Sequence, residues 1–236
     1  MQNPFPLMLF AAGFGTRMGA LTADRPKPLI PVAGRTLLDH ALAQAEGAGV
    51  RRRVVNAHYH GDQIAAHLAG TGVAVSLEDP ILDTGGGLRA ALPLLGPGPV
   101  MTLNTDAVWT GANPLSQLLQ AWDGARMDAL LLLLPADRAR SQTGRSDFVM
   151  DGQGRIDWAR GRAGYLYLGA QILNPAVLAE YPEGAFSLLE PWKRLIGQGR
   201  AYGLVHQGDW CDVGHPEGIA EAEAMLAAAP VPASHG

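Results

Sequence analysis

The chain has 236 residues, with 47% hydrophobic and 17% charged residues and a formal net charge of −4. This composition is typical of a compact folded protein, and the lack of a basic run argues against nucleic acid as a partner. A single cysteine excludes an internal disulfide, and no apolar stretch or signal pattern predicts a membrane partner, so we expect a cytoplasmic protein.

Short apolar runs alternate with helical patterns over residues 1–135. Strands are predicted at 7–11, 53–57, 73–77, 100–103 and 129–134, with helices at 36–47, 62–69, 88–95 and 114–122. This alternation predicts parallel βαβ units with right-handed crossovers.

The pattern changes beyond about residue 140. A hairpin is predicted from 146–150 and 155–158 around a Gly-containing turn. A strand at 165–173, a helix at 187–198, a strand at 201–206 and a helix at 216–228 follow. We expect one domain over 1–228, with a nucleotide half at 1–135 and a substrate half at 136–228. The Pro/Ala/Ser-rich tail 229–236 is predicted to be disordered.

A glycine-rich segment, residues 11–18 (AAGFGTRM), follows the first predicted strand. Gly13 and Gly15 permit a tight turn that gathers backbone N–H groups around phosphate oxygens. An ordinary strand-to-loop turn is the alternative for two glycines alone. The dinucleotide fingerprint fails at Met18 and no Walker A motif follows, which disfavours an NAD-dependent oxidoreductase.

Positive charge accompanies this segment. Arg17, Arg25 and Lys27 against Asp24 give residues 13–27 three cations and one acid in an acidic protein. A triphosphate needs such a site, because its leaving pyrophosphate gains charge in the transition state.

Two aspartates are candidate metal ligands. Asp106 follows the strand at 100–103, at the sheet edge where open α/β sheets bind ligands. Asp212 lies in the segment 208–214 (GDWCDVG). Carboxylates suit Mg²⁺, although Asp106 could equally begin a turn and Asp212 could cap the next helix.

Residues 11–18, with Leu21-Thr22 and residues 26–29 (PKPL), resemble the signature of the sugar nucleotidyltransferase family. The resemblance implies an α/β fold, a Rossmann-like domain whose mixed, mostly parallel central sheet is flanked by helices. It also implies Mg²⁺-dependent transfer of a nucleotidyl group from a nucleoside triphosphate to a sugar-1-phosphate, with pyrophosphate released. The family's usual Pro before Leu-Thr is Ala20 here.

The same resemblance implies roles for individual residues. Arg17, Lys27 and Asp106 would be catalytic, Asp106 and Asp212 would hold Mg²⁺, and Asp147 and Ser187 would face the sugar. Thr105 and His215 replace a common Gly and Thr beside the two aspartates. The residues that would bind the nucleotide are Ala11, Ala12, Gly13, Gly15, Thr16, Arg17, Lys27, Asn56, Asp83, Gly85 and Gly86.

The nucleobase is assigned from one further segment. Residues 82–87 (LDTGGG) resemble the nucleobase loop of the family branch that acts on N-acetylmuramate-1-phosphate in bacterial cell-wall recycling, with Asp83 in place of Glu. The glycine amides could read a base edge, or the run could be a helix-start loop capped by Asp83 or Thr84.

The resemblance favours UTP and N-acetylmuramate-1-phosphate as substrates. The alternatives are a mannose-1-phosphate guanylyltransferase, another hexose-1-phosphate nucleotidyltransferase, or a nucleotide-sugar-binding protein without activity. Retention of Arg17, Lys27, Asp106 and Asp212 argues against the last. The sequence indicates no oligomeric state.

Overall fold

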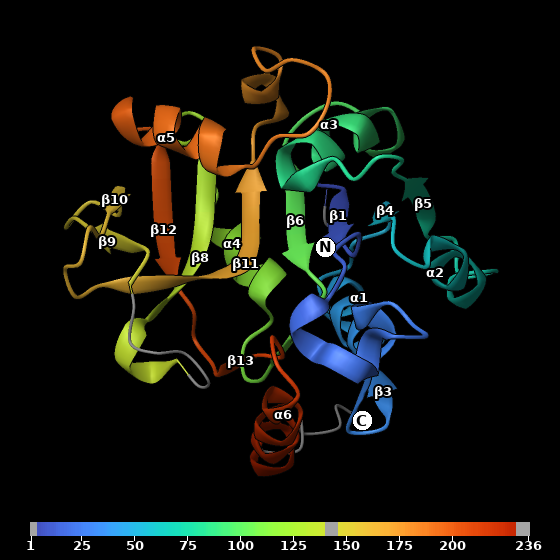
Figure 1. The fold of residues 1–236 in the computed structure, drawn as a ribbon. Coiled ribbons are helices and arrows are strands. Elements are labelled where there is room, and N and C mark those ends of the chain that lie inside the picture. The colour runs from blue at the N-terminus through green and yellow to red at the C-terminus, as the bar shows by residue number, and fades with distance from the viewer. Residues whose placement is uncertain (1–3, 140–145, 230–236) are drawn as a thin grey trace.

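The computed structural model describes residues 4–139 and 146–229. Its centre is a nine-stranded mixed sheet (Figure 1) with the order β10-β9-β11-β6-β1-β4-β5, and β8 pairs with β11 and with β12. The strands are β1 (Leu7–Phe10), β4 (Arg53–Ala57), β5 (Ala74–Leu77), β6 (Val100–Asn104), β8 (Ala129–Pro135), β9 (Phe148–Met150), β10 (Ile156–Trp158), β11 (Tyr165–Leu173) and β12 (Ala201–Val205).

The expected mixed, mostly parallel sheet is confirmed. β1 pairs in parallel with β4 and β6, and β4 with β5. One arrangement differs from a simple βαβ succession, because β8 does not lie beside β6. The antiparallel strand β11 is inserted between them and pairs with both.

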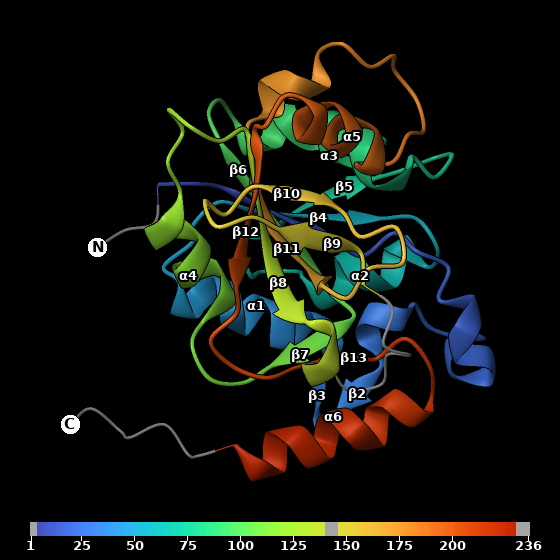
Figure 2. The same ribbon diagram turned by 90° about the vertical axis from the view of Figure 1, so that its left-hand side faces the viewer.

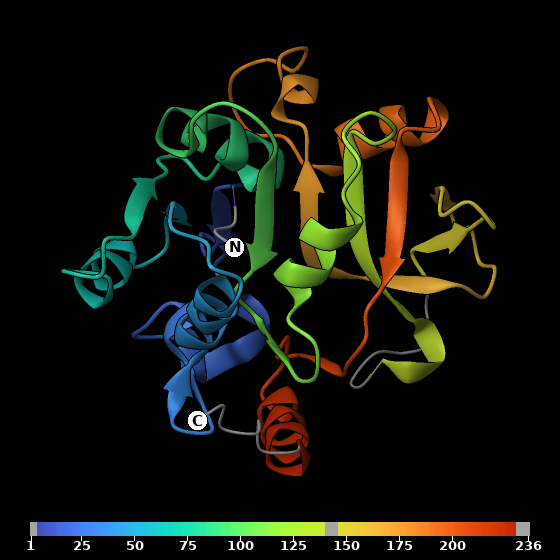
Figure 3. The same cartoon turned by 180° about the vertical axis from the view of Figure 1, so that it is seen from behind.

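Helices cover both faces of the sheet (Figures 2 and 3). One face packs against α1 (Leu37–Gly47), α2 (Gly61–His67) and α4 (Pro114–Ala121), and the other against α3 (Asp83–Leu95), η4 (Pro175–Leu178) and α5 (Leu189–Gly197). The remaining 3₁₀ segment away from the site is η3 (Ala136–Arg138). No helix within the described residues is long and apolar enough to cross a lipid bilayer.

A third, smaller core lies beyond the carboxyl ends of the strands. It joins α6 (Glu217–Ala228), the 3₁₀ segment η1 (Thr16–Thr22) and two short ribbons, β2 (Pro31–Val32) with β3 (Arg35–Thr36) and β7 (Ala107–Trp109) with β13 (Trp210–Asp212). Strands β7 and β13 were not predicted from the sequence. Each has only three residues, too short to show a periodicity.

Helix α3 corrects one sequence expectation. It begins at Asp83, not at residue 88, so Gly85–Gly87 form helix and do not precede one. The glycines are needed because a Cβ at Gly85 would overlap Phe186 and one at Gly86 would overlap the Gly184 carbonyl. Close packing therefore overrides the poor helix propensity of glycine. The predicted disordered tail, 229–236, lies outside the described residues apart from Ala229.

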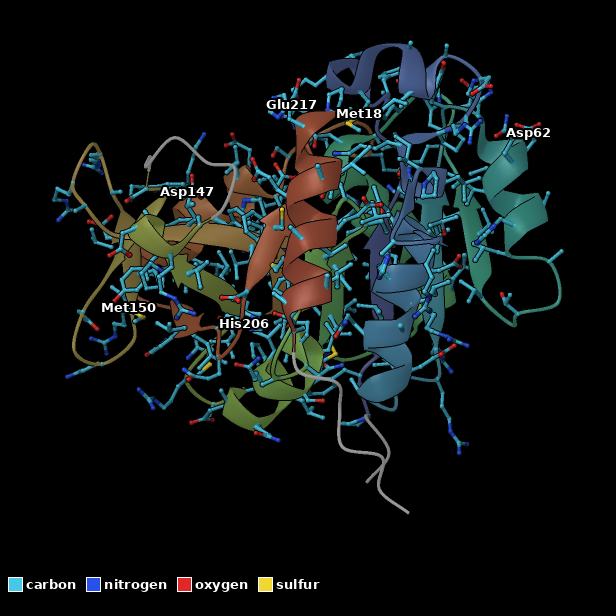
Figure 4. All side chains as sticks on the ribbon, turned by 90° about the horizontal axis from the view of Figure 1, so that it is seen from below. Met18, Asp62, Asp147, Met150, His206 and Glu217 are labelled. Carbon is cyan, nitrogen blue, oxygen red and sulfur yellow. The ribbon has the colours of Figure 1, made fainter. Side chains whose placement is uncertain are left out.

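A fully buried histidine supports the β7–β13 ribbon. His206 has an exposed fraction of 0%, its ring meets that of Trp109 edge to face at 5.2 Å, and its Nδ1 lies 2.9 Å from Gln117 Nε2. Figure 4 labels this residue. Burial lowers the pKa of His206 from 6.5 to about 4.

We predict that acid destabilises the protein through His206. A lowered folded-state pKa means that the unfolded chain binds the extra proton first, so this contribution is complete above pH 6.5 and is lost as the pH falls toward 4. The free energy of unfolding should fall by about 3 kcal/mol over this window. Denaturant titrations at stepped pH measure this free energy. In His206→Gln it should fall less steeply between pH 6.5 and pH 4, and an equally steep fall would contradict the prediction.

Candidate active site

Three parallel strands end at one edge of the sheet and carry the loops of the site. β1, β4 and β6 present their carboxyl ends here, the edge seen in Figure 4. A cleft of about 310 Å³, which we call the loop cleft, opens at this edge. Its lining includes Asp106 and nine residues expected to bind nucleotide: Ala11, Ala12, Gly13, Gly15, Thr16, Arg17, Lys27, Asn56 and Asp83.

Gly15 lets the glycine-rich loop lie against Lys27. Its φ is +64°, in the left-handed region, and an added Cβ would lie 2.9 Å from the Cβ of Lys27. Thr22 fixes the loop from below, since its Oγ1 donates to the Gly15 carbonyl at 3.2 Å. The glycine spacing therefore permits a close approach between loop and lysine.

Lys27 and Asp106 meet across the cleft. Lys27 belongs to η2 (Lys27–Leu29) and is only 8% exposed, and its Nζ donates to Asp106 Oδ2 at 2.9 Å. A nearly buried ammonium needs such a partner. This contact was not anticipated from the sequence, which suggested a phosphate as the lysine's partner.

Asn56 connects the glycine-rich loop to a buried glutamate. Its Oδ1 accepts from Ala11 N at 2.7 Å, and its Nδ2 donates to Glu78 Oε1 at 2.7 Å. Glu78 Oε2 accepts from Leu82 N at 2.8 Å. Glu78 is 4% exposed and lines the loop cleft. The sequence assigned it no role, because one acid after a strand carries no distinctive spacing.

Gly85 and Gly86 differ from the expected picture. Both amides donate to the Phe186 carbonyl, at 2.9 and 3.0 Å, and neither glycine is among the residues that line the loop cleft. Amides bonded in this way do not support the expectation that they read a base edge. Instead, Asp83 and Thr84 form this part of the wall. The assignment of Gly85 and Gly86 to nucleotide binding stays a prediction.

The β7–β13 ribbon brings the second aspartate to the first. In its antiparallel register Asp212 lies opposite Ala107, and Val213 N donates to the Asp106 carbonyl at 2.8 Å. Residues 106 steps apart in the chain therefore become neighbours through a local ladder. Thr105, one of the departures from the family pattern, is accommodated because its hydroxyl donates to the Phe10 carbonyl at 2.7 Å.

A second depression adjoins the loop cleft, and we call it the carboxylate cleft. It opens along one edge of β11, where β6 pairs with residues 170–173 and β9 pairs only with Tyr165. The unpaired stretch between them, 166–169, lines the floor. Gly169, with φ +80°, is required because an added Cβ would lie 2.8 Å from the Asn104 side chain. The remaining lining residues are Arg17, Asn104, Asp106, Asp147, Trp210 and Asp212.

Two residues expected to face the sugar lie in different surroundings. Asp147, labelled in Figure 4, lines the carboxylate cleft, and its Oδ2 accepts from Tyr167 N at 3.0 Å on the open edge of β11. Ser187 lies before α5, where its Oγ accepts from Leu189 N at 3.3 Å. Ser187 is not among the described residues that line either cleft.

The electrostatics of the carboxylate cleft depend on two acids held together. Burial, followed by the negative charge of Asp106, raises the pKa of Asp212, while Lys27, Arg17 and His215 oppose the shift. Arg17 lines both clefts and forms no salt bridge with any residue that the structure describes. The site therefore has excess negative charge at one point and an available guanidinium beside it.

This donor set fits a hard divalent cation. A bound cation would reduce the repulsion between the two carboxylates, and Mg²⁺ prefers oxygen ligands of this kind. Among residues 4–139 and 146–229, no group of three or more His, Cys, Asp or Glu side chains is placed to hold a metal. A cation at Asp106 and Asp212 would thus take its other ligands from water and substrate.

Comparison with known proteins agrees with this architecture. The family model described as "MobA-like NTP transferase domain" matches residues 7–208. The chain belongs to this family of nucleotidyltransferases.

The similarity extends over nearly the whole chain. It is 41% identical to N-acetylmuramate alpha-1-phosphate uridylyltransferase of Caulobacter vibrioides, covering 97% of this chain and 99% of the relative. It is 32% identical to the Neisseria meningitidis serogroup B protein of the same name, covering 94% and 98%. The fold matches a putative glucose-1-phosphate thymidylyltransferase from Bacillus anthracis with a TM-score of 0.78 at 16% identity, over 96% of each chain. The family of sugar-1-phosphate nucleotidyltransferases expected from the sequence is confirmed.

We predict that the charged form of Asp212 lowers the stability of this nucleotidyltransferase at neutral pH. A raised carboxyl pKa means that the fold favours the protonated form, so that stabilisation is lost as the pH rises through the folded-state value. At neutral pH, Asp212→Asn should therefore raise the melting temperature in chelator-containing buffer, by roughly 2–4 °C for each kcal/mol gained. Thermal scans at pH 7.5 measure this, and an equal or lower melting temperature would count against the charge conflict.

Proposed function

We propose that the protein is a uridylyltransferase that joins UTP to N-acetylmuramate-1-phosphate in a Mg²⁺-dependent reaction. The observation that carries the proposal is that Arg17 and Asp106 line both clefts. A triphosphate in the loop cleft and a sugar phosphate in the carboxylate cleft would thus meet at one pair of side chains. The names of the two relatives supply the nucleobase and the sugar.

The reaction needs no protein nucleophile. A phosphate oxygen of the sugar phosphate attacks the α-phosphorus of the triphosphate, and the bond from that phosphorus to the oxygen bridging to the β-phosphate breaks, so pyrophosphate leaves. Holding two polyanions in line and offsetting their charge supplies most of the rate enhancement. Arg17 would offset charge on the leaving pyrophosphate.

Lys27 and the two aspartates divide the remaining work. Asp106 and Asp212 would hold Mg²⁺, which when bound neutralises phosphate charge and favours attack. Lys27 lies 2.9 Å from Asp106 and restrains that carboxylate at the junction of the clefts. Asp147 would accept a hydrogen bond from a sugar hydroxyl, and the division into a nucleotide half (1–135) and a sugar half (136–228) belongs to the same proposal.

The substrates are tested with a matrix of reactions. UTP, GTP, dTTP, ATP and CTP are each incubated with N-acetylmuramate-1-phosphate, N-acetylglucosamine-1-phosphate, mannose-1-phosphate and glucose-1-phosphate, and pyrophosphate release is measured with Mg²⁺ and then with EDTA. We expect the highest kcat/KM for UTP with N-acetylmuramate-1-phosphate and no turnover in EDTA. A preference for GTP with mannose-1-phosphate would establish the guanylyltransferase alternative, and binding without turnover would indicate an inactive binding protein.

The metal assignment is tested by Asp106→Ala. Loss of one of two metal-binding carboxylates should lower kcat by at least about 100-fold, in the range seen when a transition-state charge contact is removed. The melting temperature in EDTA separates this from misfolding, and the rise that Mg²⁺ produces in the wild type should disappear. Near-wild-type turnover by a folded variant would refute the assignment.

A further inference from the structure

A third depression, which we call the basic pocket, continues from the carboxylate cleft. It encloses about 910 Å³ between the β9–β10 hairpin, the turn after it and the start of α5. Asp147 lines both the carboxylate cleft and the basic pocket. A sugar whose phosphate lies beside Asp106 would therefore extend its ring past Asp147 and direct a ring substituent into this pocket. The other lining residues are Ser146, Trp158, Arg160, Gly161, Arg162, Ala163, Leu189 and Lys193.

The pocket concentrates cations in an acidic protein. Arg160, Arg162 and Lys193 line it, and Lys193 is one of only two lysines in the chain. Two of the three already have partners: Arg162 faces Asp157 at 3.6 Å and Lys193 faces Glu190 at 2.7 Å. Arg160 forms no salt bridge or hydrogen bond with any residue in the described parts of the chain, so its charge is available to a ligand.

The turn that presents Arg160 is braced from both sides. Ala159 N donates to the Asp147 carbonyl at 2.8 Å, and Arg162 donates from Nη2 to the Trp158 carbonyl at 2.7 Å and from Nε to the Ala159 carbonyl at 3.0 Å. Arg162 therefore holds the turn. Arg160 itself has φ +50°, a conformation uncommon for a residue with a side chain. Strain of this kind at a cleft wall is a recognised sign of a functional position.

Polar and apolar groups complete the pocket. Ser146 Oγ is buried and has no hydrogen-bond partner among the residues that the structure describes, although a buried hydroxyl ordinarily finds one. Trp158 and the 44%-exposed Leu189 supply apolar surface beside it. A hydroxyl, an unpaired guanidinium and an apolar wall suit a short carboxylate-bearing substituent. One unpaired cation matches the single charge of a carboxylate better than a dianionic phosphate.

We infer that the basic pocket binds a carboxylate carried by the sugar, with Arg160 as the residue that sets specificity for acidic sugar-1-phosphates. The inference rests on the proposed function, and it adds the group that distinguishes N-acetylmuramate from N-acetylglucosamine, since only the former has a lactyl carboxylate. Arg160 makes a charge-assisted hydrogen bond to that carboxylate, and Ser146 donates a second.

The test compares the two sugar-1-phosphates, which share a ring and differ in the lactyl group. Arg160→Gln should lower kcat/KM for N-acetylmuramate-1-phosphate by about 10- to 100-fold, mainly through KM, and leave N-acetylglucosamine-1-phosphate unaffected. Arg160→Lys should recover part of the loss because it restores the charge. The matched control is Arg51→Gln, an exposed arginine before β4 at the opposite edge of the sheet, which should change neither substrate.

Calorimetric binding of both sugar phosphates separates failure of the pocket from failure of the proposed function. Two results would contradict the assignment of the pocket and leave the proposed nucleotidyl transfer intact. One is turnover by the wild type with equal kcat/KM for both sugar phosphates, and the other is an equal loss of kcat/KM for both in Arg160→Gln. Absence of any turnover would overturn the proposed function. In that case, tighter binding of the acidic sugar phosphate by the wild type, abolished in Arg160→Gln, would still support the pocket. Equal binding of the two sugar phosphates by the wild type would contradict it.

Discussion

The site depends on holding the carboxylates of Asp106 and Asp212 near each other despite the repulsion between their charges. A short antiparallel ladder enforces this proximity, because Val213 N is bonded to the Asp106 carbonyl and residue 212 lies opposite residue 107. The ladder is in turn held by apolar packing below it, where Met18, Val108 and Met225 belong to one small core. Backbone hydrogen bonds and apolar packing thus offset the electrostatic repulsion between the two carboxylates.

Two cations near these carboxylates, Lys27 and Arg17, differ in burial and in their partners. Lys27 is nearly buried and makes a direct contact with Asp106, so it acts as a fixed counter-ion. Arg17 is exposed and lines both clefts without a salt bridge to a described residue. Its guanidinium is therefore free to follow a phosphate. Gly15 connects the two cations, because it lets the Gly-rich loop that carries Arg17 lie directly against the stem of Lys27 in η2.

Much of the fold was predictable because its signals are local. The apolar runs of β4 and β11 predicted the observed bounds of both strands, and the Gly-rich segment after β1 lines the loop cleft. The β7–β13 ribbon was not predictable, since three-residue strands carry no period and their pairing joins distant parts of the chain. Glu78 was missed for a related reason: its role comes from Asn56 and Leu82 in space, and no motif marks it.

A backbone irregularity in β11 lies beside the carboxylate cleft, because the register of this strand against β8 shifts between Tyr167 and Gln171. Strand β6 leaves the edge of β11 at residue 170 and β9 pairs with it only at residue 165, so a short edge remains open between them. Open edges usually invite pairing with another chain. Here Asp147 accepts one of the exposed amides, that of Tyr167, and the cleft above the edge runs between the two aspartates and the hairpin. A regular sheet would fill this edge with backbone hydrogen bonds. The irregularity around Gly169 therefore goes with an open edge between Asn104 at the end of β6 and Asp147 before β9, and both residues line the carboxylate cleft.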